Sequence, residues 1–113
     1  MKLFAQGDVL LELVDDAEPT TPIGVDPDGA VVLARGEVTG HRHAFYGGQV
    51  LMFRDDGLAH GVPPELYIGH IKIADVSAEL RHEEHATITL PKGTYRVRRQ
   101  REFDAGEVRV VAD

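Results

Sequence analysis

The pattern of the whole chain is set by the stretch Val9-Leu10-Leu11-Glu12-Leu13-Val14 and by the loop that follows it, Glu18-Pro19-Thr20-Thr21-Pro22. Residues 9–14, rich in Val and Leu, have the length and composition of a buried strand. The two prolines of the following loop exclude a helix there, because proline removes a backbone donor and clashes with the preceding helical turn. The chain is therefore predicted to begin with a strand that ends in an irregular loop.

Similar apolar runs recur along the chain with turn residues between them. Asp26-Pro27-Asp28-Gly29 is a predicted turn, because proline presets φ and glycine accepts a positive φ. Residues 75–85 alone have a helical composition, and since so short a helix is marginal by itself, both a helix and a turn stay open there. The further predicted strands are residues 30–38, 41–46, 49–54, 66–73, 87–90, 94–103 and 108–111, with a turn at Pro91-Lys92-Gly93 and another at Asp104-Ala105-Gly106.

About eight short strands joined by Gly and Pro turns predict an all-β fold, a small barrel or a β-sandwich. The chain has 113 residues, which is enough for a single domain spanning residues 1–113. With 42% hydrophobic and 27% charged residues, its composition excludes a disordered protein. No apolar run approaches the roughly 18–20 residues of a membrane-spanning helix, so no membrane association is expected.

Cysteine is absent, which excludes disulfides, thiolate chemistry, iron–sulfur clusters and cysteine-based zinc sites. The N-terminal residues Met1-Lys2-Leu3-Phe4 meet Gln6 and Asp8 before an apolar segment of signal-peptide length can form. A cytoplasmic location is the expectation that fits both observations.

The net charge of -7 is unevenly distributed, because residues 1–56 carry 4 basic and 10 acidic side chains. Lys92, Arg96, Arg98, Arg99 and Arg101 form a local basic strip in the other half. An acidic protein is a poor binder of phosphate backbones, so general nucleic-acid binding is not expected. We expect the strip to pair with the acidic half, with Arg96 and Arg98 on a solvated face of their strand.

Two pairs of histidines carry the clearest chemical signal. His41 and His43 are two residues apart, so on a strand both rings leave the same face, and they share the parity of Val31, Leu33 and Phe45 on the predicted core side. His82 and His85 are three residues apart and can converge on a helix or in a turn. Together the pairs predict a site for a divalent transition metal, with Zn, Fe, Mn, Cu and Ni as candidates, which Glu37, Glu83 or Glu84 could complete.

Other kinds of site have little support. His60 and His70 are interpreted as surface or satisfied core residues, and the single serine, Ser77, stands outside any nucleophile motif. Neither phosphate-binding glycine motif is present, so no nucleotide cofactor is expected. Whether the protein is an enzyme stays open.

The segment from Gly36 to His43 resembles the start of the first cupin motif, a glycine followed by His-x-His, and Pro91-Lys92-Gly93 resembles the Pro-x-Gly turn of the second. This resemblance implies a cupin-like barrel with His41 and His43 as ligands. Arg96 stands where the last cupin histidine would be, and the expected glutamate after His43 is missing.

A second resemblance covers most of the chain. Residues 6–11, 36–43, 80–85 and 90–103 are similar to a family of small uncharacterised proteins from bacteria and their phages. The function expected from the sequence is a small metal-binding β protein that takes a small-molecule ligand or a protein partner, with a homo-oligomer left open. The alternative is a non-enzymatic interaction module that engages a partner through the strand from Tyr95 to Arg101, by strand addition or through its arginines.

Overall fold

A computed structural model describes residues 2–15, 17–36, 39–47, 49–104 and 107–110 of the chain, with side chains described up to Gln100. The described part is almost entirely β, as expected, and its one helical element is the short 3-10 helix η1 (Asp56–Leu58). No helix in it is long and apolar enough to span a membrane. The strands are β1 (Leu3–Gln6), β2 (Val9–Val14), β3 (Val31–Arg35), β4 (Arg42–Phe45), β5 (Val50–Phe53), β6 (Tyr67–Leu80), β7 (Ile88–Arg99), β8 (Arg101–Asp104) and β9 (Glu107–Val110).

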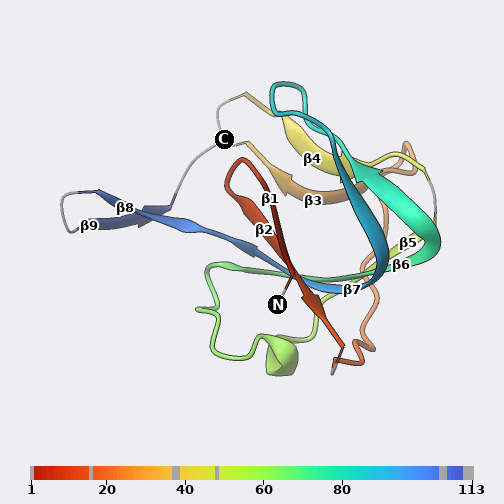
Figure 1. Ribbon diagram of the computed structural model, residues 1–113, viewed down its shortest axis with the longest axis horizontal. Helices are drawn as coiled ribbons and strands as arrows, with labels where there is room; N and C mark the ends of the chain where they lie inside the picture. Colours follow the sequence, from red (N-terminus) through yellow and green to blue (C-terminus); the bar gives the residue numbers. More distant parts are fainter. Residues whose placement is uncertain (1, 16, 37–38, 48, 105–106, 111–113) are drawn as a thin grey trace.

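The main sheet is antiparallel, with the strand order β1-β2-β7-β6-β5. The long strands β6 and β7 curve across the molecule and bring their far ends against the separate β3–β4 hairpin, while the β8–β9 hairpin projects from the body (Figure 1). The layers form a sandwich-like arrangement. A closed barrel, the other half of the expectation, is wrong, because β1 and β5 are the two ends of an open sheet.

The core lies between the main sheet and the β3–β4 hairpin. Strand β2 shows why its sequence forms a half-buried strand, since Val9 and Leu11 are fully buried while Leu10 and Glu12 on the other face are half-buried. Residues from both layers meet in one apolar cluster that includes Leu11, Phe45, Ile71, Leu90 and Tyr95.

Residues 75–85, where both a helix and a turn stayed open, contain no helix, because β6 continues to Leu80 and a short loop follows. One local expectation is corrected. Pro91-Lys92-Gly93 is not a turn but part of β7. Pro91 lies opposite Ser77, next to a register shift between Ile73 and Ser77, and such bulged positions tolerate proline in a sheet.

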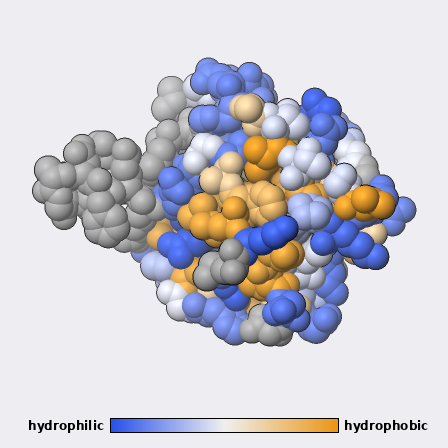
Figure 2. Space-filling view, viewed as in Figure 1, coloured by the Kyte–Doolittle hydropathy of each residue, from blue (hydrophilic) through white to orange (hydrophobic). Residues whose placement is uncertain are grey.

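The face of the molecule that Figure 1 presents is hydrophilic at its periphery and carries apolar side chains near the middle, where β1 and β2 lie (Figure 2). On the end strand β1, Leu3 is 56% exposed. Apolar surface is therefore accessible on this hairpin, on the side opposite to Val9 and Leu11.

Candidate metal centre

The two histidine pairs are joined by a β-bridge between β4 and the end of β6. Ala44 and Arg81 exchange both backbone hydrogen bonds, at 3.0 and 2.9 Å. In antiparallel register this places His43 opposite His82 and His41 opposite Glu84. Segments forty residues apart in the sequence are thus held side by side at one end of the sandwich, near the tip of the β1–β2 hairpin (Figure 1).

The structure brings all four predicted histidines together. The ring centroids are 5.5 Å apart for His41 and His82, 4.4 Å for His43 and His82, 4.6 Å for His82 and His85, and 5.9 Å for His43 and His85. The His43 ring is fully buried, as its parity predicts, and the other three are half-buried. His41 lies one residue before β4 begins. We call these four residues the histidine cluster.

Gln6, at the end of β1, defines the proton position on His43. The Gln6 amide nitrogen donates to the carbonyl oxygens of Leu80 at 2.8 Å and Ala86 at 3.0 Å, which leaves its Oε1 as an acceptor. This oxygen lies 2.9 Å from His43 Nδ1. Nδ1 therefore carries a proton, which leaves Nε2 as the nitrogen that a neutral ring would offer to a metal. Metal-binding histidines are commonly oriented by such a bond from the other nitrogen.

The turn between β1 and β2 contributes its two central residues, Gly7 and Asp8. Gly7 has a φ of 57°, and a Cβ placed on it would lie 2.6 Å from His85 Nε2, so the turn backbone touches the imidazole. Asp8 is fully buried, with Oδ1 3.5 Å from His43 Nε2 and Oδ2 bonded to Arg99. Burial raises the pKa of the Asp8 carboxyl, but the interactions with His43 and Arg99 outweigh burial and leave the pKa below its usual value.

His82 organises the loop that carries the second pair. Its Nδ1 accepts hydrogen bonds from the backbone N–H groups of Glu84 at 3.0 Å and His85 at 3.1 Å. The neutral ring consequently carries its proton on Nε2. Coordination of a metal through Nε2 would require the proton to move to Nδ1 and these two bonds to be released.

Carboxylates border the solvent side of the cluster. Glu83 accepts a hydrogen bond from the backbone N–H of Arg42 at 2.9 Å, which lowers the pKa of this carboxyl. Glu84 lies 3.7 Å from His41 Nδ1. Donor atoms of His41, His82 and Glu83 lie within 4.8 Å of one another. Glu37, the third candidate carboxylate, lies outside the described residues.

A family model for a domain of unknown function, DUF8820, matches residues 5–100. The chain belongs to the DUF8820 family. No curated protein and no solved structure matches it. The expected membership of an uncharacterised family is confirmed, and none of these comparisons links the chain to cupins or phages. The DUF8820 match includes the whole histidine cluster together with Gln6, Asp8 and Arg99.

Sequence reasoning missed Gln6, Gly7 and Asp8 as parts of this centre. A glycine at the first of two turn positions between apolar runs is a recognisable hairpin signal. Nothing in the local pattern, however, indicates that the polar residues on either side of Gly7 are buried.

The remaining histidines of the DUF8820 domain lie elsewhere. His60 is exposed, and His70 is buried with its Nδ1 2.7 Å from the Tyr67 hydroxyl. Both interpretations made from the sequence agree with these positions.

Arg96, in the basic strip of residues 92–101, is buried in the structure and not solvated as expected. Arg96 is 7% exposed and pairs with Glu12 at 2.9 Å, so its expected solvation is wrong, whereas the expected pairing with the acidic half is confirmed by Glu12 and by Asp8 on Arg99. Residues 94–99 of β7 pair with β2, and most of them also pair with β6. Strand addition at this segment, part of the alternative function, is therefore not available to a partner.

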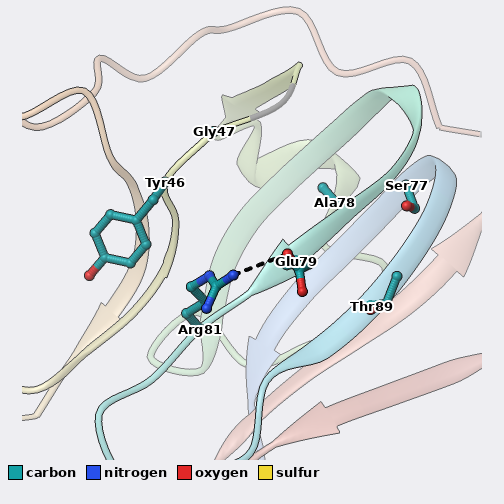
Figure 3. A pocket seen from close by; sticks show the side chains of 7 residues that line it. All are labelled: Tyr46, Gly47, Ser77, Ala78, Glu79, Arg81 and Thr89. Atoms are coloured by element: carbon teal, nitrogen blue, oxygen red, sulfur yellow. Dashed lines mark hydrogen bonds and ion pairs between the residues drawn. The ribbon is translucent and has the colours of Figure 1, made fainter.

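A cavity of about 520 Å³ lies between residues 46–47, which follow β4, and residues of β6 and β7. One wall is formed by Tyr46 and Gly47, and the opposite wall by Ser77, Ala78 and Thr89 of β6 and β7 (Figure 3). Between the two walls, Arg81 and Glu79 form an ion pair at 3.1 Å. No histidine lines this cavity, so it is separate from the histidine cluster.

Proposed function

We propose that this DUF8820 protein binds a divalent transition-metal ion through His41, His43, His82 and His85. The observation that carries the proposal is the convergence of these four imidazoles, from two segments joined by the Ala44–Arg81 bridge, at centroid separations of 4.4–5.9 Å between neighbours. Imidazole nitrogen suits zinc, copper, nickel and iron, and the adjacent carboxylates also suit manganese.

The four residues differ in how directly they can coordinate. His43 is prepared for Nε2 coordination, because Gln6 holds its other nitrogen as a donor. His82 is not, because its Nδ1 accepts two backbone hydrogen bonds in the 82–85 loop. We therefore expect metal binding to be accompanied by rearrangement of this loop, while His43 and the β1–β2 turn stay in place.

The test is zinc binding by tag-free protein that has been treated with a chelator and dialysed. We expect one zinc ion per chain by isothermal titration calorimetry and elemental analysis, together with a rise in melting temperature, since a ligand that binds only the native state stabilises it. His43→Ala should lower the zinc affinity by about tenfold or more.

His60→Ala is the matched control, because His60 is exposed and lies outside the cluster. It should bind zinc like the wild-type protein. A wild-type protein that binds no transition metal, or an equal loss of affinity in His43→Ala and His60→Ala, would contradict the proposal.

A further inference from the structure

We infer that Asp8 is a ligand of the same metal ion, with Oδ1 beside His43 Nε2 and Arg99 holding the other carboxylate oxygen. The inference rests on the proposed function and adds an oxygen donor from a third segment, the β1–β2 turn. It also makes the predicted donor set mixed, nitrogen and carboxylate oxygen, which suits borderline and hard divalent ions such as zinc, iron and manganese better than soft monovalent copper.

The two oxygens of the fully buried Asp8 carboxylate have different surroundings. Oδ2 accepts a hydrogen bond from Arg99 Nη1, and this guanidinium also donates to the carbonyl oxygen of Arg35 at 3.3 Å. Oδ1 has no hydrogen-bond partner among the described residues, although Asp8 is 0% exposed. Buried carboxylate oxygens are rarely left in this state, because losing water without a replacement is costly.

Asp8 Oδ1 lies at a ligand-like distance from the His43 ring. Gln6 occupies Nδ1 of the His43 ring, so Nε2 is the nitrogen that can face a metal ion. Asp8 Oδ1 lies 3.5 Å from this Nε2. This separation exceeds that of a good N–H···O hydrogen bond, about 2.7–3.2 Å. Two donors bound to one tetrahedral zinc ion at about 2.0–2.2 Å lie about 3.3–3.6 Å apart. The pair thus has the spacing of two ligands of one ion.

The negative charge of the Asp8 carboxylate also favours a cation at this position. A carboxylate without a cation would be strongly disfavoured at a site with no exposure. Arg99 supplies one positive charge at Oδ2, whereas Oδ1 is the oxygen beside His43. Arg99 thus orients the carboxylate through Oδ2 and leaves Oδ1 facing His43, as the hydrogen-bond partners of carboxylate ligands do in metalloproteins.

The experiment compares zinc binding by the wild-type protein, Asp8→Asn and Asp75→Asn. Asp8→Asn keeps the shape of the side chain but removes its charge, and we expect the zinc affinity to fall by about tenfold or more. Asp75→Asn is the control, because Asp75 is exposed on β6 and its side chain bonds to the backbone of Val76. It should bind zinc like the wild-type protein.

A second measurement decides the matter even where Asp8→Asn does not fold. In the wild-type protein labelled with ¹³C at aspartate, zinc should shift the Cγ resonance of Asp8 and leave that of Asp75 in place. Zinc binding by the wild-type protein with an unmoved Asp8 resonance, or with unchanged affinity in Asp8→Asn, would overturn this inference alone and identify Asp8 as a charge partner of His43. Failure of the wild-type protein to bind any transition metal would overturn the proposed function as well.

Discussion

At the scale of single residues, the centre depends on three consecutive residues with separate tasks. Gln6 orients His43, Gly7 allows the His85 ring to touch the turn backbone, and Asp8 faces His43 Nε2. Each task needs one residue type, because an amide must both donate and accept, a glycine must leave room, and a carboxylate must carry charge.

Gly7→Ala should destabilise the protein more than an alanine at another glycine with positive φ. The new Cβ would lie 2.6 Å from His85 Nε2, in addition to the strain of a φ of 57°. We expect a loss of about 2–4 kcal/mol in the free energy of unfolding, measured by urea denaturation. At Gly29, with a φ of 83° and no atom within 4 Å of the Cβ that alanine would add, the substitution should cost about 1 kcal/mol. Equal costs at both positions would show that His85 moves away freely.

At the scale of elements, the loop between β5 and β6 covers the outer side of the main sheet. Its Leu58 carbonyl oxygen accepts a hydrogen bond from Arg96 Nε at 3.3 Å, and Asp55 bonds to the hydroxyl of Tyr67 through its backbone. His70 on β6 is buried in this region. Burial, aided by the positive charge of Arg96, lowers the pKa of His70.

This burial predicts a loss of stability in mild acid. In the unfolded chain His70 binds a proton near pH 6.5, whereas in the native state its pKa is lower. The free energy of unfolding therefore falls as the pH drops below about 6.5. His70→Phe should lose less stability than the wild-type protein between pH 7.5 and pH 5.5 in urea denaturation with chelator present, by up to about 1.4 kcal/mol per pH unit. The same loss in both proteins would contradict a neutral, buried His70.

At the scale of the whole molecule, two arginines of the basic strip pair with carboxylates of the acidic N-terminal half. Arg96 and Arg99 of β7 pair with Glu12 and Asp8 from the N-terminal hairpin, so these two arginines are already bound to carboxylates. The net charge of the chain is -7. Arginines held in such pairs contribute little to attraction of phosphate.

The protein should therefore not bind short DNA or RNA duplexes at about 0.15 M salt. Fluorescence anisotropy with labelled duplexes at several salt concentrations measures this directly. Tight binding that weakens steeply with added salt and disappears in the double variant Arg96→Ala/Arg98→Ala would show that the internal ion pairs open to bind phosphate.

The sequence by itself determined the local structure well. Residues 9–14 form the predicted strand with the predicted bounds, and His43 faces the core with Phe45, because alternation along a strand is a local property that needs no partner. It also placed the candidate ligands in two short segments. The Pro91-Lys92-Gly93 error arose because local turn chemistry was outweighed by pairing with β6 at a bulge.

Only the tertiary structure decided what surrounds these histidines. The Ala44–Arg81 bridge joins the two segments, and the β1–β2 turn adds Gln6 and Asp8 from the other end of the chain. Polar residues beside a turn are usually solvated, so their burial cannot be inferred from neighbours in sequence. It becomes favourable only when distant groups, such as the Leu80 carbonyl oxygen and the Arg99 guanidinium, replace the hydrogen bonds and charge screening of water.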